Sequence, residues 1–206
     1  MQIKQIYEKY QIMPQLATHM LRVAGVGKLI LDGWSGAIDR DLVMRTLLLH
    51  DMGNIVKFDL TKLILPIENI EHWIGVQQEW WDKYGRDTHG VTVAIARELK
   101  QDDVIEIFEQ EHRGYSSGDT GQILRQSWPA KMLAYADVRV TPTEVVPMQE
   151  RITDLQKRYG RELSWYDFLY PLEEQIREQT TLDLNKINEQ GVAPFFTELL
   201  GYNIET

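Results

Sequence analysis

The residues best suited to chemistry in this 206-residue chain are its five histidines and the carboxylates near them. His50 is followed directly by Asp51, and histidine with carboxylate is the ligand set for divalent first-row metals where thiolates are lacking. Because adjacent side chains on a helix diverge by about 100°, this doublet grips an ion only if other helices close its far side. His19 and Asp137, each inside a predicted helix, are candidates for that closure.

Each of these residues also has an ordinary structural explanation. A histidine at the C-terminal end of a helix complements the helix dipole, and an aspartate after it often caps the following turn. For any one residue taken alone, the structural explanation is the better one. The combination with the neighbouring residues favours the chemical interpretation.

Helices must position these residues, because apolar side chains recur at steps of three and four along most of the chain. Strand signals are sparse, so the expected fold is all-α, a single domain of about eight to ten helices. Residues 55–66 stay unassigned, and residues 114–121 are a loop by composition. The predicted helices cover 15–31, 39–50, 67–84, 88–99, 102–114, 129–140, 144–159, 164–190 and 192–200.

The ends of these helices follow from capping residues, glycines and prolines. Asp39, Thr88 and Asp102 are predicted N-caps. Gly114 is expected to terminate the helix that begins at Asp102. Pro171 is expected to break or kink the helix over 164–190.

The composition, 43% hydrophobic and 26% charged, is that of an ordinary globular protein. Cysteine is absent, which excludes disulfide scaffolds, zinc fingers, iron–sulfur clusters and cysteine nucleophiles. The apolar runs are too short to span a bilayer, and the N-terminus lacks the apolar stretch of a signal peptide. These features predict a soluble protein of a reducing compartment such as the cytoplasm, without membrane association.

The net charge of −9 argues against long nucleic acid as a partner, since its binding requires clustered lysine and arginine. Residues 1–140 carry 16 basic and 19 acidic groups, whereas residues 141–206 carry 6 and 12. We therefore expect a metal-binding helical domain over residues 1–142. Residues 143–206 are then an acidic, helical C-terminal extension packed on that domain.

The segments around these four candidate ligands resemble the corresponding segments of a known superfamily, the HD-domain metal-dependent phosphohydrolases. That superfamily is recognised by a histidine, a later His-Asp doublet and a distant aspartate, all on helices. The flanking residues match as well, and the resemblance spans about residues 15–142. The matching segments are His19-Met-Leu-Arg22-Val23-Ala24, Leu49-His50-Asp51-Met-Gly53 and Ala136-Asp137-Val138-Arg139.

The resemblance implies four ligands for one metal ion and two histidines for a second ion, with Asp51 bridging the two. His72 has no place in the pattern and is interpreted as a surface or packing residue. Such sites accept Mn, Fe, Co, Ni or Zn, whereas Mg is less expected as the sole ion. The implied ligands are His19, His50, Asp51 and Asp137 for the first ion, with His89 and His112 for the second.

The chain departs from the family at two places. Family members often have lysine, or a catalytic glutamate, three residues after the aspartate of the doublet, where this chain has Asn54. Asparagine cannot act as a general acid or base, so proton transfer falls to metal-activated water or to another group. The Gly-Tyr-Pro signature of the cyclic-dinucleotide subgroup is absent, and Gly114-Tyr115-Ser116 matches it only in part.

The function implied by the resemblance is hydrolysis of a small phosphorylated metabolite or nucleotide by metal-activated water. Asp51 and Arg22 are the expected catalytic residues, since Arg22 lies one turn beyond His19 and has the geometry to bind phosphate. Arg113 and Lys57 are secondary candidates for the same contact. Arg139 is expected to make structural contacts instead.

Two alternatives belong to other classes. The same His/Asp set can hold two irons, as in members of the superfamily that resemble oxygenases. The site can also serve as a non-catalytic nucleotide or metal sensor, with the acidic C-terminal helices forming a partner or homodimer surface. In that case Trp80-Trp81 and Trp165-Tyr166 would lie at the interface, although tryptophans at helical spacing more often belong to the core.

Overall fold

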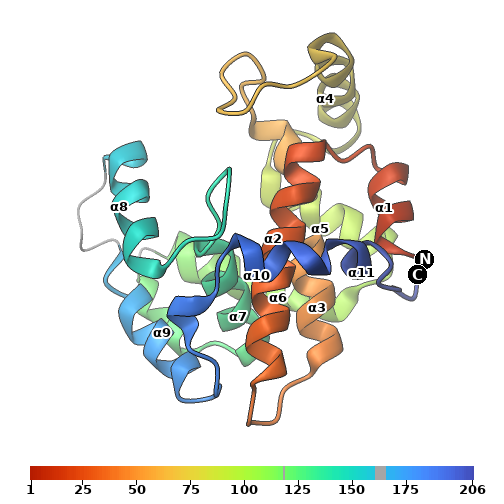
Figure 1. Cartoon of the computed structure of the whole chain (residues 1–206). Helices are drawn as coiled ribbons and strands as arrows, with labels where there is room; N and C mark the ends of the chain where they lie inside the picture. The colour runs from red at the N-terminus through yellow and green to blue at the C-terminus, as the bar shows by residue number, and fades with distance from the viewer. Residues whose placement is uncertain (118, 161–165) are drawn as a thin grey trace.

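The computed structural model describes residues 1–117, 119–160 and 166–206, and its regular elements are helical (Figure 1). Within those residues no β-strand forms, and only three isolated bridges pair extended backbone. No helix of the described residues combines the length and apolar character needed to cross a bilayer. The all-α fold class predicted from the hydrophobic periodicity is confirmed.

The α-helices follow one another with short 3-10 helices between them. The 3-10 helices that matter below are η1, over Asn54–Lys57, η2, over Thr120–Arg125, and η4, over Leu184–Lys186. The α-helices are α1 (Ile3–Lys9), α2 (Pro14–Asp32), α3 (Arg40–Leu49), α4 (Ile70–Tyr84), α5 (Thr88–Glu98), α6 (Asp102–Ser116), α7 (Trp128–Val138), α8 (Met148–Tyr159), α9 (Leu169–Arg177), α10 (Glu189–Val192) and α11 (Phe196–Leu200).

Helices α2, α3 and α7 pack on one another at the centre of the molecule. Each of them either carries a candidate ligand or leads directly into one. Their shared face is apolar, and residues such as Val23 and Leu47 are wholly buried there. α3 begins where predicted, because the Asp39 carboxylate accepts a hydrogen bond of 2.9 Å from the backbone N–H of Leu42. α6 packs against α3 and α7, and α5 packs against α6.

The C-terminal part of the chain lies across the helices that carry the ligands. In Figure 1 the blue segment with α10 and α11 crosses α2, and the two chain ends lie side by side. The backbone N–H of Ile3 donates to the carbonyl of Tyr202 at 2.9 Å, and that of Ile204 donates to the carbonyl of Met1 at 2.8 Å. α9 packs against α7. This segment therefore contacts both α2 and α7.

Arg139 connects α7 to the segments that follow it. Its side chain is 0% exposed and donates hydrogen bonds to the carbonyls of Val146, Leu184 and Ile187. It also donates to the hydroxyl of Tyr135, at 2.6 Å. The structural role expected for Arg139 agrees with these contacts.

Gly114 does not terminate α6 as predicted, because the helix continues to Ser116. A Cβ atom at Gly114 would lie 2.6 Å from Cγ1 of Ile123 in η2. The glycine is therefore required by close packing between two elements rather than by the end of a helix.

The helix predicted over 164–190 is wrong in its extent. Residues 161–165, including Trp165, lie outside the described part of the chain. After them only α9 is a helix of more than two turns, and η4 and α10 follow separately. Pro171 stands in the first turn of α9, where its missing N–H has no partner within the helix to lose, so it neither breaks nor kinks that helix.

Two predicted caps are displaced by one residue. Asp87, not Thr88, caps α5, and its carboxylate accepts from the N–H of Gly90 at 3.0 Å. Gln101, not Asp102, stands at the cap position of α6. In both places the residue with extended or irregular backbone precedes the expected one.

Candidate metal centre

Four side chains from separate parts of the chain converge at the centre of the molecule. His19 comes from α2, His50 and Asp51 follow α3, and Asp137 lies near the end of α7. One potential ligand atom of each lies within 4.8 Å of those of the other three. Among the described residues, no other group of three or more histidines and carboxylates converges in this way. The structure therefore brings together the four residues predicted to hold one ion.

The distances within this group place nitrogen and oxygen atoms around one point. Nε2 of His19 lies 3.0 Å from Oδ1 of Asp137 and 3.4 Å from Oδ2 of Asp51. Nε2 of His50 lies 3.6 Å and 3.7 Å from the same two oxygens. The two Nε2 atoms are 3.4 Å apart. Both imidazoles thus direct the same ring nitrogen towards the pair of carboxylates.

A backbone contact orients the ring of His50. Its Nδ1 lies 2.8 Å from the carbonyl oxygen of Leu47, one turn earlier in α3, and a carbonyl can only accept. The proton of the neutral ring is therefore held on Nδ1, which leaves the lone pair of Nε2 directed at the cluster. Contacts of this kind fix the tautomer of metal-binding histidines.

The electrostatics of the cluster call for a cation. Burial alone would lower the pKa of His19, but hydrogen bonds to Asp137 and Asp51 and the charges of both outweigh it and raise this pKa to about 9. Burial would raise the pKa of Asp137, yet the two histidines hold it well below its usual range. Two neighbouring carboxylates that stay ionised need positive charge between them, which a divalent cation supplies better than a proton. The donor set therefore fits a bound metal ion.

A cavity of about 170 Å³ opens onto this cluster. Its wall is mostly polar, and apolar groups contribute only at Phe108 and Leu133. α5, α6, α7 and the turn after the doublet all contribute to it. The lining residues are His50, Asp51, Asn54, Lys57, Thr88, His89, Thr92, Phe108, Glu111, His112, Leu133 and Asp137.

His89 and His112, which were predicted to hold a second ion, lie next to each other in the wall of this cavity. Their rings are stacked, with centroids 4.0 Å apart and planes inclined by 16°. Nε2 of His89 lies 3.1 Å from a carboxylate oxygen of Glu109. The structure thus places both histidines beside Asp51 and Asp137 in one cavity but outside the converging group of four. Their role as ligands of a second ion stays a prediction.

Gly53 allows the turn after the doublet to pack directly on the first turn of α5. Its backbone N–H donates to the hydroxyl of Thr92 at 3.0 Å. A Cβ atom at this position would lie 2.6 Å from the carbonyl oxygen of Thr88 and 2.8 Å from the backbone nitrogen of Thr92. This contact with backbone atoms cannot relax cheaply. His89 belongs to the same first turn of α5.

We expect Gly53→Ala to lower the free energy of unfolding by about 1–3 kcal/mol, because the added methyl group pushes α5 away from the doublet. The matched control is Gly75→Ala in α4, where a Cβ would meet nothing within 4 Å. That variant should gain roughly 0.4–1 kcal/mol from reduced freedom of the unfolded chain. Urea denaturation of both variants checks the prediction, and equal effects at the two positions would contradict it.

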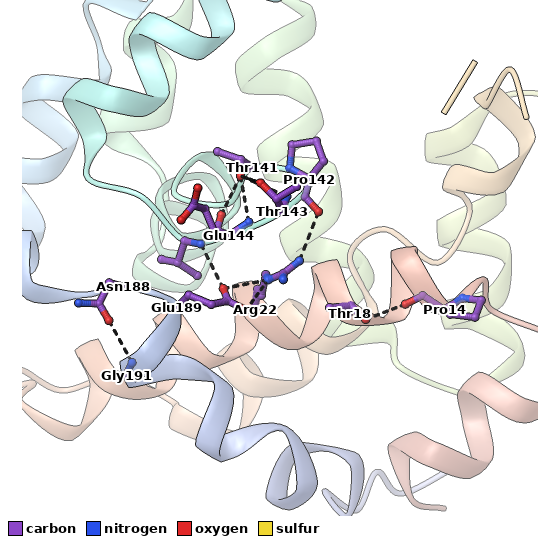
Figure 2. A network of polar contacts seen from close by, with 11 residues as sticks. Pro14, Thr18, Arg22, Thr141, Pro142, Thr143, Glu144, Asn188, Glu189 and Gly191 are labelled. Carbon is purple, nitrogen blue, oxygen red and sulfur yellow. Dashed lines mark hydrogen bonds and ion pairs between the residues drawn. The ribbon is translucent and has the colours of Figure 1, made fainter. Parts of the chain in front are cut away.

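Arg22 is not among the residues that line the cavity, and its guanidinium is paired elsewhere, so its expected contact with phosphate stays a prediction. Figure 2 shows its guanidinium between Glu189 and Pro142. Nε lies 2.9 Å from both carboxylate oxygens of Glu189, and a terminal nitrogen donates to the carbonyl of Pro142 at 3.3 Å. The side chain is only 12% exposed and is not among those that line the cavity. Arg22 therefore joins α2 to the C-terminal segment.

The structure also places the remaining basic residues that the sequence analysis singled out. Arg113 lines a separate polar depression on the far side of α6, next to Gln110 and Gln126. His72 is exposed on α4, where it packs edge-on against Trp73. Of the basic residues considered as phosphate contacts, Lys57 alone lines the cavity.

Glu111 is a cavity residue that the sequence reasoning did not select. Burial, followed by the charges of Asp137 and Asp51, raises the pKa of Glu111 to about 8. A signal for it existed in the spacing, because Phe108, Glu111 and His112 recur at steps of three and four on one face of α6. Its neighbour His112 drew attention to the position without identifying the glutamate.

Comparison with known proteins agrees with this geometry. The family model described as HD domain matches residues 16–150, a range that contains every residue of the converging group. No curated protein and no solved structure matches the chain. Proteins of the matching family are mostly metal-dependent hydrolases. Since this family model matches well over half of the chain, the protein belongs to the HD-domain family.

Proposed function

We propose that this protein is a metal-dependent phosphohydrolase that acts on a small phosphorylated metabolite or nucleotide. The observation that carries the proposal is the convergence of His19, His50, Asp51 and Asp137 at one end of a small polar cavity. A divalent ion held by these four groups would supply Lewis acidity and would lower the pKa of a water molecule. Membership of the HD-domain family supports the same reaction class.

The size of the cavity supports a small substrate. Its volume of about 170 Å³ is below the roughly 300–1,000 Å³ of sites that enclose drug-sized ligands. A phosphate group with a short organic portion is compatible with this space, with Thr88 and Asn54 as polar groups in the wall. A cyclic dinucleotide is not supported by either the volume or the sequence.

Glu111 is the lining carboxylate that does not belong to the converging group. Asn54 cannot move a proton, so we propose that a carboxylate oxygen of Glu111 does so during hydrolysis. In this assignment the four converging residues hold the ion, and Glu111 acts on the substrate or the attacking water.

The first test is the metal content per chain of protein purified without chelator, for the wild type and for His89→Ala. We expect at least one ion per wild-type chain and metal-dependent release of inorganic phosphate from a panel of small phosphomonoesters. Two ions falling to about one in the variant would show a binuclear site, whereas one ion in both would show a mononuclear one. No metal and no turnover, even after soaking in Mn, Fe(II), Co, Ni or Zn, would contradict the proposal.

Glu111→Gln separates catalysis from binding in the same assay. The variant keeps the size of the side chain but loses its proton-transfer function, so it should bind metal normally and lose most of the turnover, by about 10²-fold or more. A sensor that only binds a nucleotide would show no turnover in the wild type either. Unchanged turnover in Glu111→Gln would overturn the assigned role of Glu111 and leave the hydrolase proposal intact.

No feature of the described residues favours the di-iron oxygenase over the hydrolase. The oxygenase would need a second ion between Asp51 and the two histidines, which line the same cavity as Asp51 but lie outside the converging group. Exposure of Fe(II)-loaded protein to O₂ with optical and EPR monitoring would nevertheless detect such chemistry directly.

A further inference from the structure

We propose that Lys57 binds the phosphate group of the substrate and that α4 positions it for this role. The inference rests on the proposed function and names the residue that replaces both Arg22 and the family's lysine. Among the described residues that line the cavity, Lys57 is the only lysine or arginine. Of the alternatives, Arg22 is paired with Glu189, and the position of the family's lysine is taken by Asn54.

The position of Lys57 follows from the turn after the doublet. η1 begins three residues after Asp51, with Asn54 as its first residue and Lys57 as its last, and both line the cavity. Lys57 is therefore three residues beyond position 54, where family members carry lysine. The side chain of Lys57 is exposed, and none of its contacts within the described residues is an ion pair.

The charge of the cavity makes this cation necessary. Asp51 and Asp137 already balance the charge of a divalent ion held between them. A phosphate ester brought beside these groups carries one or two further negative charges. Lys57 supplies positive charge at the wall, and an ammonium group binds phosphate as a point charge with three hydrogen-bond donors.

α4 holds the backbone on both sides of Lys57. The side-chain amide of Gln77 donates to the carbonyls of Ile55, at 2.6 Å, and Phe58, at 2.9 Å. The indole N–H of Trp81 donates to the carbonyl of Val56 at 2.9 Å. These contacts fix the turn that carries the lysine. α4 stands apart from the central helices in Figure 1 and packs on η1 and α5. We assign Gln77 and Trp81 as positioning residues.

Binding of inorganic phosphate to the Mn²⁺-loaded protein, measured by calorimetry, tests the role of Lys57 independently of turnover. Lys57→Gln should raise the Kd for phosphate by about tenfold or more, as expected for loss of a charged hydrogen bond. Lys57→Arg should retain a larger part of the affinity. The matched control is Lys62→Gln, which removes the same charge from an 80% exposed lysine that does not line the cavity. The control should bind phosphate as the wild type does.

The positioning role is tested by a double-mutant cycle. Trp81→Phe keeps most of the aromatic packing but removes the N–H that holds Val56, so it should weaken phosphate binding when Lys57 is present. In the Lys57→Gln background the same change should have little further effect, because the two residues act through one contact. Equal effects in both backgrounds would overturn the positioning role.

The outcomes distinguish the two proposals. If Lys57→Gln binds phosphate as tightly as the wild type while the wild type hydrolyses phosphomonoesters, the role of Lys57 is overturned and the proposed function stands. If the metal-loaded wild type binds no phosphate and hydrolyses no phosphomonoester, both are overturned. A selective loss in Lys57→Gln, with Lys62→Gln unaffected, supports the assignment.

Discussion

Asp51→Ala is expected to abolish metal binding and turnover together. Asp51 contributes one of the two carboxylates of the converging group, and its Oδ2 lies within 3.7 Å of Nε2 of both His19 and His50. Without it two imidazoles and one carboxylate remain, and the negative charge that offsets a divalent ion is halved. We expect the metal content to fall from at least one ion per chain to below about a tenth of an ion, because affinity depends on the full ligand set.

Metal analysis of the purified variant, with phosphate release measured beside it, checks this expectation. Asp82→Ala is the matched control, since it removes an exposed carboxylate of α4 whose only side-chain hydrogen bond within the described residues comes from Gln78. Near-UV circular dichroism confirms that both variants remain folded. An unaltered metal content in Asp51→Ala would contradict the assignment of Asp51 as a ligand, and with it the mechanism proposed above.

Arg139→Met should be the most destabilising single change among those considered. The buried guanidinium satisfies the carbonyls of Val146, Leu184 and Ile187, and it donates to Tyr135. Methionine fills much of the volume but leaves these acceptors without donors in a dry interior. We expect the free energy of unfolding to fall by about 3–5 kcal/mol, because several buried acceptors lose their donor at once and each unsatisfied one costs roughly 1–3 kcal/mol.

Chemical denaturation of Arg139→Met beside Arg97→Met measures this effect. Arg97 is exposed on α5, so its replacement should change stability by no more than roughly 0.5 kcal/mol. Arg139→Lys should also destabilise, because a single ammonium group cannot serve four acceptors that the planar guanidinium reaches at once. A loss below about 1 kcal/mol in Arg139→Met would show that the acceptors find other donors, and that this contact does not hold the C-terminal segment to α7.

Helices and ligand candidates could be read from the sequence because both depend on local patterns. A period of 3.6 residues is visible within 15-residue windows along most of the chain, and the Asp39 carboxylate accepts from an N–H only three residues away. The four candidate ligands were identifiable because they stand in short motifs that resemble a family, and the structure does bring them together. The displaced caps at Asp87 and Gln101 mark the usual limit of one residue at helix ends.

Contacts between distant segments could not be read in the same way. Arg22 lies one turn from His19, and the sequence alone makes it a natural phosphate ligand. Its partner Glu189 is 167 positions away, and nothing in the local sequence pattern predicts that pair. Gly114 illustrates the same limit, because its close neighbour Ile123 belongs to a different element.

The sequence by itself determined that the chain is helical and that His19, His50, Asp51 and Asp137 are its candidate ligands, since local propensity and short motifs suffice for both. Only the tertiary structure decided which of the charged residues face the cavity. Packing removed Arg22 from it and brought Glu111 and Lys57 into it. The physical reason is that the partner of a charged side chain is set by how helices far apart in the chain pack together, and such contacts leave no periodic trace in the sequence.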